Sequence, residues 1–413
     1  MKTLHVLPDR DAPQVSQQEI MTRAEHYSAR NYHPLQVVLA RAEDVWVWDS
    51  DGRRYLDCLS AYSAVNQGHR HPRIIQALKE QADRLTLTSR AFHNDRMGGF
   101  LERLCTMAEM DRALPMNTGA EAVETAIKTA RKWGYKVKGV AQDQAEIIVC
   151  RNNFHGRTTT IVGFSSEEQY RDGFGPFTPG FKAIDFGDID QLEAAITPNT
   201  VAFLVEPVQG EGSILVPPQG YFNEVRRVCR EHNVLYITDE IQTGLGRTGK
   251  LFCYQHDSDA KPDMLIVGKA LGGGVYPVSA VISSEAILGV FQPGDHGSTF
   301  GGNPLGAAVA DAALQVIEDE ELVERAAESG EYVMERLHQL PSDSIAEIRG
   351  RGLLIGIELK PEAGPARHYC EALLDRGLLC KETHERVVRL APPLTIRRPQ
   401  LDFMLEQIEV VFT

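Results

Sequence analysis

The chain has 413 residues, of which 43% are hydrophobic and 24% charged, and its formal net charge at pH 7 is −14. These values are typical of a globular protein with about two domains. The acidic balance and the lack of a basic block argue against nucleic acid and anionic membranes as partners, and no apolar stretch is long enough to span a membrane.

The N-terminal segment, residues 1–30, is predicted to be a polar arm. Its first twenty residues contain two prolines and several acids but no apolar core, so the sequence predicts neither a secretory signal nor a transit peptide. The seven cysteines are scattered and none stands at metal-ligand spacing, which favours reduced thiols. We expect a cytoplasmic protein without a bound metal. His69 and His71 share a loop, but no third ligand stands near them.

An antiparallel hairpin is predicted at residues 45–57, because apolar and polar residues alternate on both sides of Asp51-Gly52. Between about residues 70 and 300, short apolar strand candidates alternate with helical patterns. This alternation predicts an α/β fold with a mostly parallel sheet flanked by helices, and it places the site at the carboxyl ends of the strands. The strand candidates are Glu146–Cys150, Ala202–Val205, Val234–Thr238, Met264–Val267 and Val278–Ser283.

The C-terminal part has the pattern of a smaller α+β domain. It is predicted to contain one long helical stretch, two strands and two further helices, at 304–340, Leu353–Leu359, Val387–Leu390, Arg367–Arg376 and Gln400–Val411. The predicted organisation is an N-terminal arm and hairpin that pack on the small domain, then a large domain, then the small domain, at 1–69, 70–303 and 304–413.

Three motifs in the large segment carry chemistry, and the first stands at the start of a helix. Thr118 and Gly119 lie where the helix should begin, since Glu121 and Glu124 fall in its first turns and Ala-rich helix formers continue to Arg131. A helix start offers unpaired backbone N–H groups and a positive dipole end, which together bind a phosphate dianion. Similar residues also cap helices that bind no ligand, so this motif is weak alone.

The second motif follows the strand predicted at Val234–Thr238. Asp239 and Glu240 end this strand, and the alternation of side chains would turn Asp239 and Ile241 the same way. A carboxylate and an apolar side chain that face one planar ligand fit pyridoxal 5'-phosphate (PLP). The carboxylate keeps the pyridine nitrogen protonated, while the apolar chain packs on the ring. A surface acid at a strand end is the alternative interpretation.

The third motif is Lys269, which follows the apolar run Met264–Val267 and precedes the cluster Gly272–Gly274. A lysine at the end of a buried strand suits Schiff-base chemistry, because desolvation and cationic neighbours lower its pKa and free the amine as a nucleophile. A surface lysine in a glycine-rich turn would look the same in isolation. The three motifs in this order favour a PLP site.

From about Tyr27 to its C-terminus, the chain resembles the class III aminotransferases of PLP fold type I. Besides the three motifs, the resemblance rests on Asn31-Tyr-His-Pro-Leu, Tyr62-Ser-Ala-Val-Asn-Gln-Gly-His, Leu85-Thr-Leu-Thr-Ser-Arg-Ala-Phe, Val205-Glu-Pro-Val-Gln-Gly-Glu, Gly297-Ser-Thr-Phe-Gly-Gly-Asn-Pro and Arg389-Leu-Ala-Pro-Pro. It implies a large PLP-binding domain with a mostly parallel sheet, a smaller C-terminal domain, and a homodimer or higher homo-oligomer with shared active sites.

The resemblance also implies roles for individual residues around the cofactor. Lys269 is expected to bind PLP and to act as general base and acid, and Asp239 to pair with the pyridine nitrogen. The residues expected around the phosphate are Thr118, Gly119, Ala120 and, from the neighbouring subunit, Thr299. The residues expected to pack on the ring, hydrogen-bond it or help to fix it are Phe154, Ile241, Gln242 and Glu206.

Two half-reactions follow from the resemblance: L-ornithine gives up its δ-amino group and leaves as glutamate-5-semialdehyde, and 2-oxoglutarate accepts the group and leaves as glutamate. Arg157 suits the distal carboxylate of either substrate. Arg389 suits the second carboxylate of glutamate but would be an unpaired cation when ornithine binds. Glu211 stands where the family has a glutamate that neutralises this arginine in the first half-reaction only. A salt bridge in the C-terminal domain and a solvated loop acid are the alternatives for these two residues.

Two tyrosines point to ornithine as the amino donor. In the family, Tyr32 meets the α-amino group and Tyr62 shapes the pocket so that the ω-amine faces the cofactor, whereas half-buried packing is the alternative for a lone tyrosine. His155 stands where animal members have tryptophan, and Phe-His-Gly-Arg-Thr is commoner in members that use N-acetylornithine. An aminotransferase for N-acetylornithine, GABA or another ω-amine is therefore the second hypothesis. A third, an inactive binding scaffold, conflicts with the intact lysine and its acidic partners.

Overall fold

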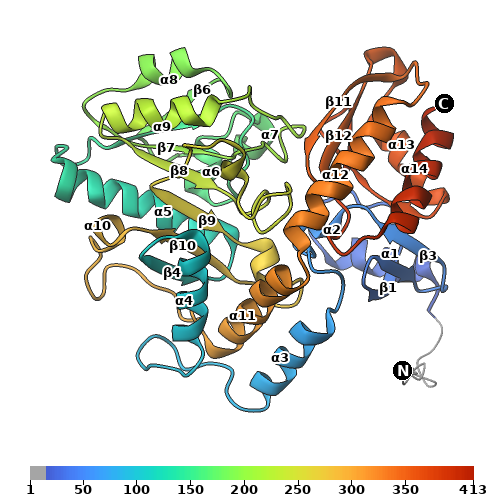
Figure 1. Ribbon diagram of the computed structural model, residues 1–413, viewed down its shortest axis with the longest axis horizontal. Coiled ribbons are helices and arrows are strands. Elements are labelled where there is room, and N and C mark those ends of the chain that lie inside the picture. The colour runs from blue at the N-terminus through green and yellow to red at the C-terminus, as the bar shows by residue number, and fades with distance from the viewer. Residues whose placement is uncertain (1–14) are drawn as a thin grey trace.

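The computed structural model describes residues 15–413 of the chain. Two bodies lie side by side: a large one built on a central sheet with helices on both faces, and a smaller one in which helices cover two short sheets (Figure 1). This is the α/β arrangement that the sequence predicts. Residues 1–14 of the predicted arm, which are most of the segment to which the prediction on targeting signals applies, lie outside the described residues.

The central sheet has seven strands in the order β4-β10-β9-β8-β7-β5-β6. Strands β6, β5, β7, β8 and β9 run parallel, and β10 is antiparallel to both of its neighbours. Every residue of β7 to β10 is buried, as expected for apolar strands covered on both faces. The bounds are β4 Arg112–Met116, β5 Glu146–Cys150, β6 Phe181–Ile184, β7 Thr200–Val205, β8 Leu235–Asp239, β9 Met264–Val267 and β10 Ser279–Ser283.

Helices pack on both faces of this sheet, and β5 shows how its residues divide between them. Ile147 and Val149 belong to the core on the side of α5, whereas Ile148 and Cys150 belong to the core under α8 and α9. A third core joins the large body to the small one. The helices of the large body are α3 Pro72–Ala82, α4 Met97–Ala108, α5 Gly119–Trp133, α6 Thr159–Gly163, α7 Glu168–Arg171, α8 Ile189–Ala195, α9 Tyr221–Glu231, α10 Glu285–Leu288 and α11 Pro304–Asp319.

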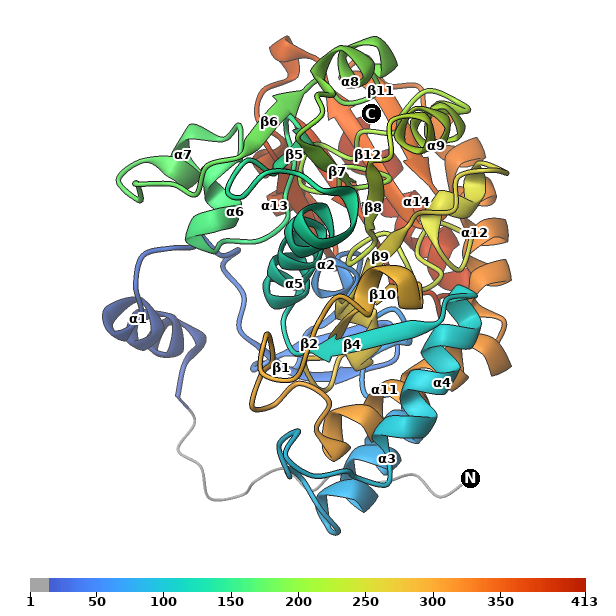
Figure 2. The same ribbon diagram turned by 90° about the vertical axis from the view of Figure 1, so that its left-hand side faces the viewer.

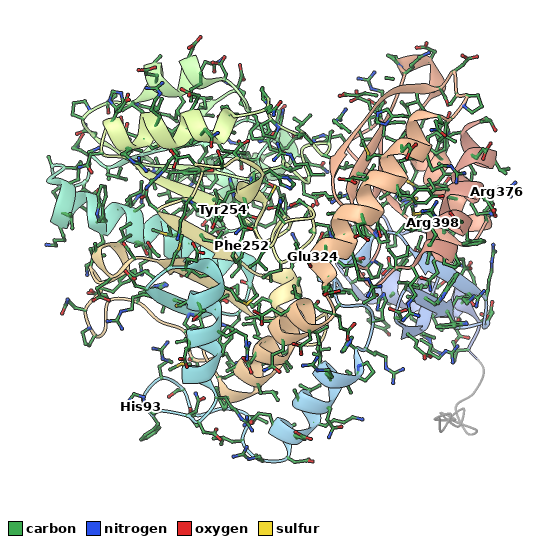
Figure 3. The ribbon with its side chains drawn as sticks, viewed as in Figure 1. His93, Phe252, Tyr254, Glu324, Arg376 and Arg398 are labelled. Atoms are coloured by element: carbon green, nitrogen blue, oxygen red, sulfur yellow. The ribbon has the colours of Figure 1, made fainter. Side chains whose placement is uncertain are left out.

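The core shared by the two bodies contains the rings of Phe252 and Tyr254, which stack with centroids 6.0 Å apart. Both rings lie in the interior (Figure 3), and the same cluster continues to Ala326 and Val333 of α12 (Leu322–His338). By contrast, Arg398 lies on the outside of the molecule. Apolar packing thus runs without a break from the large body into the small one.

The smaller body contains two four-stranded sheets, ordered β11-β12-β15-β14 and β1-β2-β3-β13. In the second sheet an antiparallel hairpin around Asp51-Gly52 pairs through β3 with β13, so the N-terminal segment lies against the C-terminal one. The remaining bounds are β1 Leu39–Glu43, β2 Trp46–Asp49, β3 Arg54–Asp57, α2 Ser60–Ser63, β11 Ile345–Arg351, β12 Leu354–Leu359, α13 Ala366–Asp375, β13 Leu378–Leu379, β14 Lys381–Thr383, β15 Val387–Leu390 and α14 Arg398–Phe412.

Two helical predictions need correction. The long helix expected from 304 to 340 is two helices, α11 and α12, because Glu321 takes a left-handed backbone conformation with φ of 51°. The arm predicted at 1–30 contains a helix, α1 (Gln17–Tyr27), which begins where the Ser16 hydroxyl accepts the N–H of Glu19. This helix has no buried residue and stands at the edge of the molecule (Figure 2). No helix within residues 15–413 is long and apolar enough to cross a membrane.

Candidate active site

Three neighbouring parallel strands, β7, β8 and β9, end in the predicted site residues. Glu206 follows β7, Asp239 is the last residue of β8, and Lys269 stands two residues beyond β9. Because carboxyl ends of parallel strands meet at one edge of a sheet, these three side chains converge. Glu206 and Asp239 both act electrostatically on Lys269.

Lys269 is held in an unusual backbone conformation at the start of a short 3-10 helix, with φ of 43°. A left-handed lysine costs conformational energy, and such residues concentrate at functional sites. Burial lowers the pKa of the Lys269 amine and Arg389 lowers it further, whereas Glu211, Asp239 and Glu206 oppose the shift. The environment therefore favours a free amine, as the sequence predicts.

Asp239 is buried and keeps both of its oxygens hydrogen-bonded. Oδ1 accepts the backbone N–H of Ile241 at 3.1 Å, and Oδ2 lies 2.7 Å from Nδ1 of His155. Strand β8 ends at Asp239, so side-chain alternation does not extend to Ile241 as expected from the sequence. The neighbouring acid Glu240 serves the fold instead, because it accepts the backbone N–H groups of two residues in the next turn, Cys253 and Tyr254.

A turn, and not the strand, brings Ile241 into the site. A Cβ added to Gly119 would lie 3.0 Å from Cδ1 of Ile241, and one added to Gly268 would lie 3.4 Å from its Cγ2. Ile241 therefore touches both the start of α5 and the residue before Lys269. Only glycine leaves this approach undisturbed at position 119.

Helix α5 begins at Gly119, where the sequence predicts it. Thr118 caps the helix: its hydroxyl accepts the N–H of Glu121 at 3.2 Å, and the Glu121 carboxylate accepts the N–H of Thr118 at 2.8 Å. The N–H groups of Gly119 and Ala120 lie in the first turn, where no helical partner exists for them. They are available to an anion.

The buried side chains of Glu206 and His155, with the half-buried Phe154 between them in the network, form one group beside Asp239. The Glu206 carboxylate accepts the N–H of Phe154 at 2.9 Å. Burial raises the pKa of Glu206 to about 7, with Asp239 adding to the rise and His155 opposing it. Burial disfavours a charged His155, but its hydrogen bond to Asp239, together with the negative charges of Asp239 and Glu206, outweighs burial and raises its pKa. The protonated form of His155 is thus favoured by the two carboxylates that face it.

Arg389 and Glu211 form a bidentate ion pair at the other side of the site. Nη1 lies 2.6 Å from Oε1 and Nη2 lies 3.0 Å from Oε2, and the Arg389 side chain is buried. Burial opposes ionisation of Glu211, but Arg389 and then Lys269 outweigh it and lower its pKa to about 2. Gln242 joins this group, since its Nε2 donates to Glu211 at 3.3 Å while its buried Oε1 has no partner among the described residues. Arg389 therefore pairs with a residue outside the C-terminal domain, and Glu211 is bonded to Arg389 and Gln242 and is not free in solvent.

The remaining predicted residues lie around this centre or outside it. The Arg389 guanidinium is 5.0 Å from the ring of Tyr62, whose pKa is raised by burial. Arg157 is exposed and lies 3.8 Å from the ring centroid of Tyr170, a residue that the sequence did not single out. Tyr32 is 75% exposed, and Thr299 is also exposed. Within residues 15–413 Thr299 forms no hydrogen bond to the other predicted site residues.

The low pKa of Glu211 makes a prediction about stability and pH. Because its pKa falls from 4.5 to about 2 on folding, its contribution is present above pH 4.5 and is lost as the pH falls toward 2; it amounts to about 3 kcal/mol. We expect Glu211→Gln to lower the thermal midpoint of the cofactor-free protein at pH 7, and the difference from the parent to shrink between pH 5 and 3. Calorimetry at several pH values measures this difference, and one that grows on acidification would contradict it.

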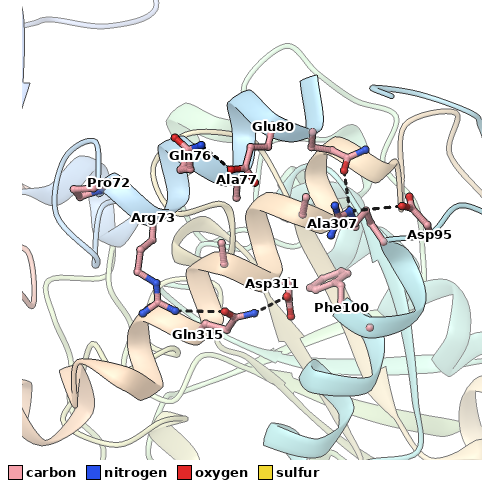
Figure 4. A pocket seen from close by; sticks show the side chains of 15 residues that line it. Pro72, Arg73, Gln76, Ala77, Glu80, Asp95, Phe100, Ala307, Asp311 and Gln315 are labelled. Atoms are coloured by element: carbon pink, nitrogen blue, oxygen red, sulfur yellow. Dashed lines mark hydrogen bonds and ion pairs between the residues drawn. The ribbon is translucent and has the colours of Figure 1, made fainter. Parts of the chain in front are cut away.

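A cavity of about 680 Å³ lies between α3, α4 and α11, away from these residues (Figure 4). Its polar side chains are bonded to one another: Arg73 donates to Gln315, which donates to Asp311. None of the predicted site residues lines it. The two loop histidines are hydrogen-bonded to carboxylates, His69 to Asp57 and His71 to Glu320.

The residues at the strand ends fit PLP. The first turn of α5 offers two N–H groups to a phosphate, Gly119 leaves space beside Ile241, and Gln242 presents a buried acceptor that no residue of 15–413 bonds. A buried carboxylate, bonded to a histidine, stands beside a lysine with a lowered pKa. This set of residues at the carboxyl edge of a parallel sheet defines a PLP-dependent enzyme of fold type I.

Comparison with known proteins gives the class of enzyme. The family model "Aminotransferase class-III" matches residues 27–412. The ornithine aminotransferase of Geobacillus sp. (strain WCH70) is 59% identical over 394 residues, which are 95% of this chain and 98% of that protein. The chain belongs to the class-III aminotransferase family, and PLP is its cofactor, so both predictions from the sequence are confirmed.

Solved structures agree with this assignment. The chain superimposes on the Toxoplasma gondii ornithine aminotransferase with a TM-score of 0.95 and 45% identity, covering 96% of this chain and 94% of that one; that structure holds PLP at partial occupancy in its active site. The acetylornithine aminotransferase of Elizabethkingia anophelis gives a TM-score of 0.88 at 50% identity, covering 96% and 98%. These neighbours show the predicted fold type. One is named an ornithine and the other an acetylornithine aminotransferase, so the fold does not choose between the two amino donors.

Proposed function

We propose that this enzyme transfers the δ-amino group of L-ornithine to 2-oxoglutarate, giving glutamate-5-semialdehyde and glutamate. The observation that carries the proposal is the bidentate Glu211–Arg389 pair next to Tyr62. An enzyme that uses only α-amino dicarboxylates has no need to neutralise its carboxylate-binding arginine. An enzyme that alternates between a cationic diamine and glutamate must neutralise this arginine while the diamine is bound.

The chain's own residues have distinct tasks in this reaction. Bound PLP supplies an electron sink when its pyridine nitrogen is protonated. The Asp239 carboxylate would accept a hydrogen bond from that nitrogen, and His155 holds the carboxylate in place. The N–H groups of Gly119 and Ala120 hold the phosphate. The Nζ of Lys269, available as a free amine, takes a proton from the δ-carbon of ornithine in the first half-reaction and gives a proton to the α-carbon derived from 2-oxoglutarate in the second.

The two substrates then differ in how they use Arg389. Ornithine carries its carboxylate at the end remote from the reacting amine, where the exposed Arg157 suits it. With Glu211 on Arg389, no uncompensated cation faces the ornithine amine. Glutamate brings a carboxylate next to its reacting amine, and this carboxylate takes the place of Glu211 on Arg389. The exchange replaces one ion pair by another, so it avoids leaving a buried charge alone.

N-acetylornithine is the second candidate donor. His155 in Phe-His-Gly-Arg and the likeness to the Elizabethkingia anophelis enzyme favour it. The donor preference is tested by assaying ornithine, N-acetylornithine, GABA and lysine side by side with 2-oxoglutarate. We expect ornithine to have the highest kcat/KM, and a higher value for N-acetylornithine would overturn the proposal.

Tyr32 provides a sharper test of the donor. It lies near enough to Tyr62 to act on it electrostatically, and its hydroxyl is proposed to meet the charged α-amino group of ornithine. Tyr32→Ile should raise KM for ornithine about tenfold, the value of one hydrogen bond to a charged group, and leave KM for GABA within about twofold. Tyr27→Ile, at an exposed tyrosine nearby in the chain, is the matched control. Equal losses with both donors would refute the role.

We infer that the working unit is a homodimer. Phe92 and Phe300 are 70% and 48% exposed, and their segments touch where Asn94 donates to the carbonyl of Gly302 at 3.1 Å. Exposed apolar side chains that lie together favour a protein interface. Thr299 is exposed beside Phe300, which suits a hydroxyl offered to a neighbouring subunit's phosphate site.

We also propose a cytoplasmic location, which the free cysteines of the chain support.

If the active site is shared between two subunits, a substitution that prevents dimer formation should also weaken PLP binding. Phe300→Glu should produce monomers and raise the dissociation constant for PLP at least about tenfold, because each site would lack the partner's threonine. Sedimentation velocity and PLP titration measure the two effects. Val410→Glu replaces an equally exposed apolar residue on α14 and should change neither. A Phe300→Glu protein that stays dimeric or binds PLP normally counts against the inference.

A further inference from the structure

The loop that carries Glu211 rests on a row of three residues in the sheet of the smaller body. Arg349 on β11 is paired in register with Gly356 on β12, and Gly356 with Arg389 on β15. Residues directly opposite each other on neighbouring strands turn the same way. The two arginines therefore stand on one face of the sheet with a glycine between them.

The glycine in the middle of the row makes room for Ile214. A Cβ added to Gly356 would lie 3.1 Å from Cβ of Ile214 and 3.2 Å from its Cγ1. Ile214 is fully buried and packs against Val208 and Leu354 in a small core of its own. The loop is thus anchored to the smaller body by apolar packing, although its chain comes from the large one.

Arg349 holds the backbone of this loop in a strained conformation. Ser213 and Ile214 have φ of 76° and 55°, a region that is costly for a β-branched residue. The Nε of Arg349 donates to the carbonyls of Ser213 at 3.1 Å and Ile214 at 3.2 Å, and Nη2 donates to Ser213 at 2.7 Å. Its Nη1 is bonded to Glu347 and Glu358, which neutralise the charge.

The two arginines of the row therefore hold the same loop in different ways. Arg389 binds the carboxylate of Glu211, which a substrate carboxylate can replace. Arg349 binds backbone carbonyls two and three residues further on, which no substrate replaces. Thr383 adds a hydrogen bond to the carbonyl of Glu211 itself at 2.6 Å.

We propose that Arg349 is a positioning residue for the Glu211–Arg389 switch. It fixes the backbone at 213–214, so that only the Glu211 side chain moves when a substrate carboxylate reaches Arg389, and the ion pair re-forms at the same place afterwards. This positioning role rests on the proposed role of Glu211 as a switch, and it explains how the Glu211 carboxylate returns to Arg389 after the substrate carboxylate has left. Loosening the loop weakens the hold of Glu211 on Arg389 and so favours dicarboxylates.

The test is a double-mutant cycle between Arg349→Met and Glu211→Ala. Single-turnover reactions give the ratio of kcat/KM for glutamate to that for ornithine, and equilibrium binding gives the affinity for glutarate, an unreactive dicarboxylate. Arg349→Met should raise both about three- to tenfold in the parent, and neither in the Glu211→Ala background. Arg349→Lys, which keeps one donor group, should give a smaller increase.

Two further variants separate positioning from general stability. Arg325 also bonds to a backbone carbonyl in the smaller body, that of Thr395 at 2.7 Å, so Arg325→Met should lower the thermal midpoint without changing the ratio. Gly356→Ala presses on Ile214 from the neighbouring position of the row and should raise the ratio as Arg349→Met does, which covers the case of an unfolded Arg349 variant.

The outcomes distinguish the inference from the function on which it rests. If Glu211→Ala shifts the ratio but Arg349→Met lowers only stability, or shifts the ratio equally in both backgrounds, the positioning role is wrong and the switch stands. If Glu211→Ala leaves the ratio unchanged, the switch is refuted and the positioning role with it.

Discussion

Replacing Lys269 by alanine is expected to slow amino transfer from ornithine by at least about 10⁴-fold, because the variant loses the group that moves the proton at the reacting carbon. No neighbouring group replaces it: the charged side chains that act on Lys269 are Glu211, Asp239, Glu206 and Arg389, none of which is a neutral amine. Turnover is measured in a coupled assay for glutamate formation, and borohydride reduction with peptide mapping locates the pyridoxyl label on residue 269 of the parent.

The same variant should still bind PLP, with a dissociation constant raised about 10- to 100-fold, since the first turn of α5 and Asp239 are intact. Lys261→Ala is the control, because Lys261 is an exposed lysine bonded to the carbonyl of Glu109 at 2.7 Å, and full activity is expected. Normal turnover by Lys269→Ala, or a label on another lysine of the parent, would remove Lys269 from its assigned role.

Residues at the ends of buried strands were predictable because their signals are local. The run Met264–Val267 is a strand with the predicted bounds, and helix α5 starts at Gly119 as its cap residues indicate. An apolar run that stops at a glycine or an acid marks both the strand and the edge where ligands bind. Lys269 and Asp239 could therefore be found without their neighbours in space.

Elements that lack such signals were missed or misjudged. Strand β6, Phe181–Ile184, is only partly buried, and β4 contains Pro115, so neither reads as an apolar strand. The break between α11 and α12 falls at Glu321, with no glycine or proline to mark it. Ile241 was expected to follow the side-chain alternation of the strand before it, but β8 ends two residues earlier and a turn supplies the contact.

Pairings between distant segments lie beyond single-sequence patterns. Glu211 and Arg389 are far apart in the chain, and only the family resemblance joined them before the structure placed them 2.6 Å apart. Arg349 and Gly356 gave no signal at all, because their importance comes from strand register in a sheet. Tyr32 and Thr299 are exposed in one chain, so their surroundings depend on what covers that surface.

Replacing Glu211 by alanine is expected to raise the ratio of kcat/KM for glutamate to that for ornithine about 10- to 100-fold, equivalent to about 1.4–2.8 kcal/mol. In the variant, Arg389 is a buried cation without its bidentate partner, so it binds the incoming carboxylate of glutamate without first losing one. Ornithine brings no carboxylate to this place and meets an uncompensated positive charge beside its own amine. Single-turnover rates for the two donors measure the ratio directly.

The control must separate this ion pair from a general loss of negative charge. Glu382 also acts electrostatically on Arg389, yet its carboxylate is bonded to Lys381 at 2.9 Å. We expect Glu382→Gln to change the ratio less than about twofold, because it leaves the hydrogen bonds of Arg389 intact. Equal shifts in the two variants would mean that the field of the site, and not the release of one arginine by one glutamate, sets the choice between a diamine and a dicarboxylate.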